Sequence, residues 1–458
     1  MPPWLIAVAG VCAAVVAGAA VAYNPALGAA FVAACAFVPL AFLSLPLALA
    51  AWIPVAWNEF SHVLGKAPLG GALVLLVAWI GTRRARGTVV ASELSLRVAR
   101  IAFVLLLIWV TLSISWASDR SHAWSEVVDW YFAGAVFLLV TTVATTPARA
   151  RLIAAAFIVG ALGSILIGLS GSGLSTTADA IDLATRQRFS GGAGDPNYLA
   201  AGLVAAVALA AGLMPSTRDP FARLGLVATV LALAVALAAT ESRGGLIAAL
   251  VALVAAVALA RERRAASAAV GLCALASTAI FLLLSPSGLE RMTTFDAGGT
   301  GRTELWRVAT QMAGDHPIAG VGIRGYEHES AAYVLELGDL QFVERIAETP
   351  VVAHNVYLQQ LAETGIVGLA LLLVLCGACL VAAQGAARRF EAGGDRAMAA
   401  LARATTVAVI GMLVASFFIS NSTDKRLWTV LALGPALLIA ARSAPHTPAA
   451  PRLASTER

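Results

Sequence analysis

The chain carries little charge. Only 12% of its 458 residues are Asp, Glu, Lys or Arg, whereas soluble domains contain about 25% charged residues. Hydrophobic residues make up 60% of the chain, and the mean hydropathy is +0.84. This composition excludes an ordinary soluble domain and predicts an integral membrane protein.

Cysteine is also scarce. Cys376 and Cys379 have the spacing of a redox motif, but they lie in the middle of an apolar segment. We therefore expect small buried hydrophobic side chains, and neither a disulfide framework nor a zinc site. All five cysteines fall inside segments that we expect to be helical: Cys12, Cys35, Cys273, Cys376 and Cys379.

Two kinds of motif are missing. The sequence has no G-x-x-x-x-G-K-[ST] run, so it offers no P-loop for a nucleotide. The segments expected outside the membrane have neither clustered carboxylates nor an Asp-x-Asp motif; Asp179 and Asp182 stand three positions apart in a loop. We therefore expect no cofactor and no bound metal.

Long apolar runs dominate the chain. They are roughly 15 to 22 residues long, which is enough for a helix to cross a bilayer. The sequence therefore predicts an all-α fold, a polytopic transmembrane helix bundle of 12–14 spans. The stretch 42–57 is expected to form a further short or re-entrant helix. The runs centre near 4–22, 26–44, 68–82, 101–116, 127–145, 152–170, 197–214, 222–240, 245–260, 266–284, 363–383, 401–420 and 427–442.

Lys and Arg alternate sharply from loop to loop, which predicts the orientation. The richer set should be cytoplasmic by the positive-inside rule. We expect N-terminal transmembrane helices over 1–284, a large outer loop over 285–362, C-terminal transmembrane helices over 363–443 and a cytoplasmic tail over 444–458. The richer loops, 82–100, 146–151, 215–223, 261–264 and 385–403, hold 16 Lys and Arg residues, and the alternate loops, 57–67, 117–126, 171–195, 241–244 and 421–426, hold 7.

The outer loop 285–362 is expected to be partly helical and folded. From Arg302 to Gly314 its apolar residues recur at helical spacing, and Asp315-His316-Pro317 ends the pattern. A glycine-rich turn over 320–325 precedes a second helix-like run that ends near Leu337. Long ordered loops are usually functional, so this loop is expected to carry active-site residues.

Four polar motifs are predicted to meet at the outer face. Each lies at a helix end, where unpaired backbone N–H groups and the helix dipole favour anions. Such a cluster in a chain short of polar residues favours a cationic binding site. The motifs are Arg186–Tyr198, Glu241–Gly245, Gly301–Trp306 and His354–Asn355.

Arg243, Arg302 and His354 are the candidate site residues. The planar fork of arginine suits a diphosphate, and a histidine can take the proton from an attacking sugar hydroxyl. Simpler roles stay open for each. Arg243 would then anchor the membrane interface, Arg302 would pair with Glu304 or another loop carboxylate, and His354 would bond near a helix start. Arg188, Arg307 and Arg324 are further phosphate candidates.

These motifs follow a specific order over residues 190–380. They are Asp195–Ala200, Ser242–Gly245, Arg302 with Trp306, Pro317–Gly322, and His354-Asn355 with Glu363–Gly365. In this order, with a large outer loop before His-Asn, the chain resembles the bacterial O-antigen ligase and Wzy-type polymerase superfamily. The first 180 residues match only as generic membrane helices.

The resemblance implies a glycosyltransferase of the bacterial inner membrane whose active site faces the periplasm. It would move a glycan from undecaprenyl diphosphate by a metal-independent, inverting reaction. Arg243 and Arg302 would hold the diphosphate, and His354 would be the general base, or would instead orient the acceptor or bind phosphate. Its partners would be the donor, a glycan acceptor and membrane lipids, with no nucleic acid. The expected supporting residues are Arg188, Asn197, Arg324, Asn355 and Glu363.

The acceptor stays open at this stage. An O-antigen ligase passes the glycan to lipid A–core oligosaccharide, a polymerase passes it to a second lipid-linked repeat unit, and some relatives glycosylate protein. The single compact outer loop favours the ligase. A flippase for lipid-linked glycans is the main rival, although the polar residues gather at one surface and not at the midplane. A different glycosyltransferase would use Glu59 or Asp119 as its carboxylate.

Overall fold

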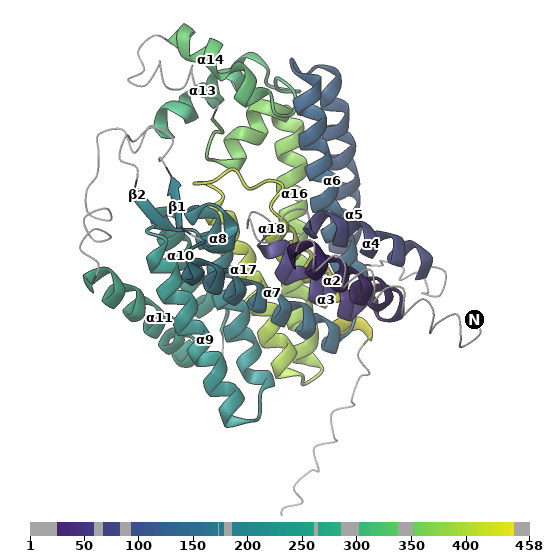
Figure 1. The fold of residues 1–458 in the computed structure, drawn as a ribbon, viewed down its shortest axis with the longest axis vertical. Helices are drawn as coiled ribbons and strands as arrows, with labels where there is room; N and C mark the ends of the chain where they lie inside the picture. Colours follow the sequence, from purple (N-terminus) through teal and green to yellow (C-terminus); the bar gives the residue numbers. More distant parts are fainter. Residues whose placement is uncertain are drawn as a thin grey trace, which may run out of the picture.

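The computed structural model shows one bundle of helices, with α13 (Arg302–Asp315) and α14 (Gly325–Leu337) at one end (Figure 1). A short antiparallel pair, β1 (Leu174–Thr177) and β2 (Arg186–Phe189), lies beside the bundle, with Leu174 opposite Phe189. The structure describes residues 25–58, 67–82, 93–172, 174–177, 186–260, 264–284, 302–337 and 351–443.

The described helices follow the apolar runs closely. The run 42–57 is indeed a separate short helix, α3, and the run 4–22 lies outside the described residues. Short helical turns extend α5, α7 and α8, at Ser113–Ser115, Gly168–Ser172 and Met214–Ser216, and a separate turn, Gly191–Ala193, precedes α8. The remaining helices are α2 (Pro25–Leu43), α3 (Leu45–Trp57), α4 (Ala67–Thr82), α5 (Leu94–Leu112), α6 (Arg120–Val143), α7 (Pro147–Ile167), α8 (Pro196–Leu213), α9 (Pro220–Ala239), α10 (Arg243–Leu259), α11 (Arg264–Leu284), α16 (Val356–Ala392), α17 (Arg396–Ala415) and α18 (Lys425–Ser443).

Seven helices in the described part of the chain are long and apolar enough to cross a membrane: α5 to α9, α16 and α17. Shorter apolar helices include most of α2 and α4, together with α3 and α10. The predicted all-α polytopic bundle is thereby confirmed. Because the first apolar run and the tail 444–458 lie outside the described residues, the total of 12–14 spans stays a prediction.

Small residues let the helices pack closely. The ring of Trp57 lies against Gly160 of α7 and Gly202 of α8, where an added Cβ would collide with it. Apolar burial drives association only weakly in lipid, so close packing of this kind stabilises membrane helices. The opposite surfaces of the bundle carry exposed Leu, Ile and Val, and Cys35 is exposed there although the sequence suggested burial. A membrane helix can expose apolar side chains to lipid, which explains the difference.

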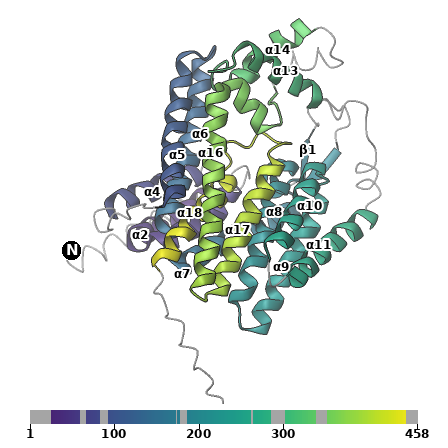
Figure 2. The ribbon, with the colours of Figure 1, turned by 180° about the vertical axis from the view of Figure 1, so that it is seen from behind.

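Helix α16 runs through the bundle between α5 and α17 and is interrupted near its start (Figure 2). At Gly365 the backbone has φ 66° and ψ −171°, a conformation essentially restricted to glycine. The N–H groups of Val321 and Gly322 donate to the carbonyls of Ala362 and Glu363 at 2.9 and 2.8 Å. The interruption therefore docks the glycine-rich turn 320–325 onto α16.

Helices α13 and α14 have a small core of their own. The predicted helical stripe of α13, Leu305, Val308, Ala309 and Met312, is fully buried. The Tyr326 hydroxyl of α14 donates to a backbone carbonyl of α13 at 2.8 Å, and Ala353 and Ala362 join the same core. This core holds α13 against the start of α16, which directly follows His354.

Candidate active site

A buried hydrogen-bond network fixes the start of α10. Arg188 is only 2% exposed, and its Nε and Nη2 donate to the Thr240 carbonyl at 3.0 and 2.8 Å. Its Nη2 also donates to Oδ1 of Asn197 at 3.3 Å. The hydroxyl of Ser242 donates to the same oxygen at 2.8 Å. Arg188 and Asn197, both predicted as supporting residues, are thereby joined to the α9–α10 hairpin.

Arg243 is the first residue of α10 and is half-buried. Ser242 caps the helix, because its hydroxyl accepts a hydrogen bond from the Gly245 N–H at 3.1 Å. An added Cβ at Gly244 would strike the ring of Phe418, so the helix start is pressed against the segment that joins α17 and α18. The guanidinium of Arg243 is therefore attached to a rigid, close-packed helix N-terminus.

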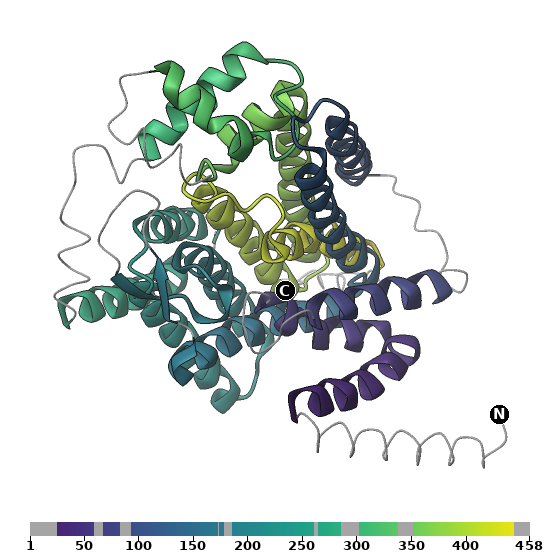
Figure 3. The ribbon, with the colours of Figure 1, turned by 45° about the horizontal axis from the view of Figure 1, so that its top comes forward.

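The His354-Asn355 motif precedes α16. The side chain of Asn355 caps this helix by accepting hydrogen bonds from two backbone N–H groups, at 3.0 and 3.1 Å. The N–H of Val356 donates to the carbonyls of Ser416 and Ile419 at 2.9 and 3.1 Å. The segment between α17 and α18, yellow in Figure 3, therefore contacts the start of α16, two residues after His354, as well as the start of α10.

Two of the three strained non-glycine residues in the described part of the chain lie at these motifs, Glu241 before α10 and His354 before α16. Among the described residues, the non-glycine residues with positive φ are Glu241, Arg324 and His354, at 50°, 60° and 49°. Each such residue costs of order 1–3 kcal/mol and persists only when its surroundings hold it in place. Strained residues cluster at functional sites, so the observation favours an active site around the α10 and α16 starts.

Arg302 begins α13 and is half-buried. Because α13 packs on α16, the loop core connects this arginine to the same region of the fold as His354. Arg243 and Arg302 are thus the first residues of α10 and α13, and His354 lies two residues before the start of α16.

Arg324 is held by carboxylates. Its Nε donates to Oε2 of Glu327 at 3.1 Å, and its Nη1 lies 4.0 Å from Oε2 of Glu126 and donates to the Ser125 hydroxyl at 3.3 Å. These partners suit a residue that ties α14 to α6. Its predicted supporting role at a phosphate stays a prediction.

Glu363 is 3% exposed and lies at the interruption of α16. The side chain of Gln359 donates to its Oε1 at 3.1 Å. Because its backbone carbonyl accepts a hydrogen bond from the Gly322 N–H, Glu363 joins the glycine-rich turn 320–325 to α16. Asn355 therefore caps α16, and Glu363 binds the neighbouring turn. Both contacts are compatible with a supporting role in a site.

From the sequence, the segment 421–426 is expected to be only a loop with two basic residues. The structure shows that it also contains a buried ion pair. Asp424 and Arg426 are 6% and 3% exposed and form a bidentate ion pair, with N–O distances from 2.8 to 3.0 Å. The guanidinium of Arg426 lies 5.1 Å from the ring of Trp57 and 6.0 Å from that of Tyr198. The Tyr198 hydroxyl donates to the Ser420 carbonyl. The signal in the sequence was an Asp-Lys-Arg run between two apolar helices.

Asp119, an alternative catalytic carboxylate, is a helix cap. It accepts hydrogen bonds from the first turn of α6, and its Oδ2 lies 2.6 Å from Nδ1 of His122. The hydrogen bond from His122 holds the pKa of Asp119 well below its usual range. These contacts describe a capping residue. Glu59, the other alternative, lies outside the described residues.

Comparison with known proteins gives a match in the second half of the chain. Residues 227–373 match the model of the O-antigen ligase family, a range that contains Arg243, Arg302 and His354. The resemblance predicted from the sequence is confirmed over this range. The match supports a membrane glycosyltransferase of the ligase or polymerase type, which uses lipid-linked glycans in general. No curated protein matches the chain.

Proposed function

We propose that this protein is an O-antigen ligase-type glycosyltransferase. It moves a glycan from undecaprenyl diphosphate to a hydroxyl of lipid A–core oligosaccharide at the periplasmic face of the inner membrane. The observation that carries the proposal is the buried network of Arg188, Asn197 and Ser242, because it fixes Arg243 at a helix N-terminus within the matched range. An arginine at a helix N-terminus offers both a fork and backbone N–H groups to a phosphate.

Arg243 and Arg302 bind the diphosphate in this mechanism. Each stands at the first turn of a helix, where the dipole also favours a negative charge. The charge on the leaving group grows as the glycosidic bond breaks, so fixed cations stabilise the transition state more than the ground state. The arginines thereby perform the task that a metal ion performs in other glycosyltransferases.

His354 is the general base. Its imidazole takes the proton of the acceptor hydroxyl as the oxygen attacks the anomeric carbon. The bond from that carbon to the diphosphate oxygen breaks, and the diphosphate leaves with the electron pair. Attack from the face opposite the leaving group inverts the anomeric configuration. The backbone of His354 is strained, with φ 49°, as that of residues at active sites often is.

The transfer of purified undecaprenyl-diphosphate-linked repeat units in detergent tests the proposal. Lipid A–core oligosaccharide and a second lipid-linked unit are offered in separate reactions, with His354→Ala as the inactive control. Product on lipid A–core alone is the expected result. A ladder of longer lipid-linked chains would instead identify a Wzy-type polymerase.

A flippase makes a different prediction in the same preparation. It would bind the donor, form no product with either acceptor, and move the lipid-linked glycan across the bilayer of a proteoliposome. Donor binding without any product would therefore reject the transferase.

A further inference from the structure

A cavity of about 620 Å³ is lined by Asp195 and Tyr198 at the start of α8, close in sequence to Asn197, which binds Arg188. Residues of α3, the start of α4, α6, the start of α8 and the segment 420–425 line it. Sites for small molecules typically measure roughly 300–1,000 Å³. None of the site residues predicted from the sequence lines it.

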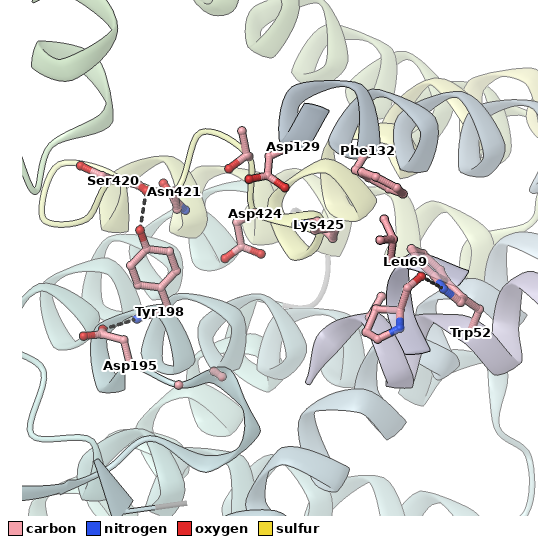
Figure 4. Close-up of a pocket in the computed structure, with 15 residues that line it drawn as sticks. Trp52, Leu69, Asp129, Phe132, Asp195, Tyr198, Ser420, Asn421, Asp424 and Lys425 are labelled. Atoms are coloured by element: carbon pink, nitrogen blue, oxygen red, sulfur yellow. Dashed lines mark hydrogen bonds between the residues drawn. The ribbon is translucent and has the colours of Figure 1, made fainter. Parts of the chain in front are cut away.

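The cavity has an aromatic side and a polar side (Figure 4). Trp52 and Phe132 lie on one side, and Asp195, Tyr198, Asn421 and Asp424 lie on the other. A sugar ring would fit both sides, because its apolar C–H faces pack on aromatic rings and its hydroxyl groups need hydrogen-bond partners.

Asn421 favours a ligand site on the polar side. The residue is 1% exposed, yet neither Oδ1 nor Nδ2 of its amide has a hydrogen-bond partner. The Oγ of the neighbouring Ser420 is also buried without a partner. Buried polar groups are nearly always paired, so an unpaired amide on a cavity wall needs an explanation. One amide supplies a donor and an acceptor, which together match a pair of adjacent sugar hydroxyls.

The wall that carries Asn421 is rigid. Tyr198 binds the Ser420 carbonyl, the indole N–H of Trp428 donates to the Ser422 carbonyl at 2.7 Å, and Asp424 is clamped by Arg426. Because these contacts already hold the wall in place, a ligand that binds there loses little free energy in ordering its side chains.

The charges of the cavity disfavour an anion. Arg426 neutralises Asp424 through the bidentate pair, which leaves the carboxylates of Asp129 and Asp195 with the ammonium of Lys425 on the lining. A phosphate or a sugar carboxylate would meet more negative than positive charge there. Hydroxyl groups and an ammonium group are both good partners for carboxylates.

We propose that this cavity binds one sugar residue without negative charge, either neutral or an amino sugar, with its hydroxyls on Asn421 and Asp129 and its ring against Trp52 and Phe132. The inference rests on the proposed function, since the sugar belongs to the glycan donor or to the glycan acceptor. The cavity shares α8 with the arginine network and the segment after α17 with His354, so a sugar bound there is adjacent to the site of transfer.

Asn421→Leu tests the cavity, because leucine has a similar volume and no polar group. Removing an unpaired buried amide should leave the unfolding temperature unchanged or raised. The KM for one of the two glycan substrates should rise about tenfold, as expected for one or two lost hydrogen bonds. Varying donor and acceptor separately shows which of them supplies the sugar. A lowered unfolding temperature with both KM values unchanged would overturn the inference.

A binding measurement on the purified wild-type protein separates this inference from the proposed function. Calorimetry with glucosamine, N-acetylglucosamine and glucuronate should detect the first two sugars and not the third, and Asn421→Leu should bind none of them. Equal binding of glucuronate would overturn the inference. If the wild-type protein binds sugar through Asn421 but transfers no glycan, the proposed function is rejected and the inference about the cavity stands. If Asn421→Leu transfers glycan with normal KM values, the inference about the cavity is rejected and the proposed function stands.

Discussion

Oδ1 of Asn197 accepts a hydrogen bond from the Ser242 hydroxyl at 2.8 Å, which joins the first turn of α8 to the cap of α10. The same oxygen also takes a bond from Arg188. Two helix starts that are distant in the sequence are therefore fixed to each other through a single amide oxygen.

Replacing Asn197 tests this junction. Asn197→Ala should lower the rate of transfer by about tenfold or more, because a hydrogen bond to a charged group contributes about 1.5–3 kcal/mol. Asn197→Asp keeps an acceptor for both Ser242 and Arg188 and should retain more activity. Initial rates with saturating acceptor give the comparison. Equal rates in Asn197→Ala and the wild type would show that the junction does not position Arg243.

His354 combines a strained backbone with a candidate catalytic ring. Asparagine tolerates positive φ better than most residues, so His354→Asn should keep the unfolding temperature while abolishing transfer. His354→Ala should also be inactive, and about 1 kcal/mol less stable because alanine adopts this conformation less readily. Transfer and thermal unfolding are measured on the same preparations. Near-normal transfer by His354→Asn would remove His354 as the base.

Arg243→Lys distinguishes a diphosphate clamp from an interface anchor. Lysine keeps the charge but loses the planar fork, so transfer should fall by at least about tenfold while the protein remains inserted. Arg388→Lys, an exposed position near the end of α16 with no predicted role in the site, is the control and should be neutral. Full activity in Arg243→Lys would favour the anchor.

Gly365 and Gly377 form a matched pair on α16. Gly365→Ala should destabilise the protein by roughly 1–3 kcal/mol, because a Cβ at this φ is strained and would strike the Ile318 carbonyl. Gly377 has open space around it, so Gly377→Ala should be neutral or up to about 1 kcal/mol more stable. Thermal unfolding in detergent reports both. Equal stability of the two variants would show that the interruption of α16 is not needed to hold the outer loop.

Chelation tests the proposal that arginines replace a metal. Pre-incubation with EDTA should leave the transfer rate unchanged, because Arg243 and Arg302 carry permanent positive charge. A loss of activity that added Mg²⁺ or Mn²⁺ restores would contradict the arginine mechanism.

The sequence by itself determined the helices of this protein. The runs 68–82 and 222–240 became α4 (Ala67–Thr82) and α9 (Pro220–Ala239), and the helical pattern after Arg302 became α13. Helices in lipid satisfy their backbone within a few residues, so apolar run length and capping residues such as Asp219 are sufficient. The motifs that contain Arg243, Arg302 and His354 could likewise be recognised in the sequence, because polar residues are rare in such a chain.

Only the tertiary structure decided which of these motifs meet. Three features depend on which helices are neighbours. They are the hydrogen bond from Arg188 to Thr240, the hydrogen bond from Gly322 to Glu363, and the unpaired amide of Asn421 in its cavity. Apolar runs carry little information on that point, because lipid-facing and helix-facing residues are both hydrophobic. Neighbours in a membrane bundle are chosen by close packing of small residues and by a few polar contacts, and these exist only once the helices are assembled.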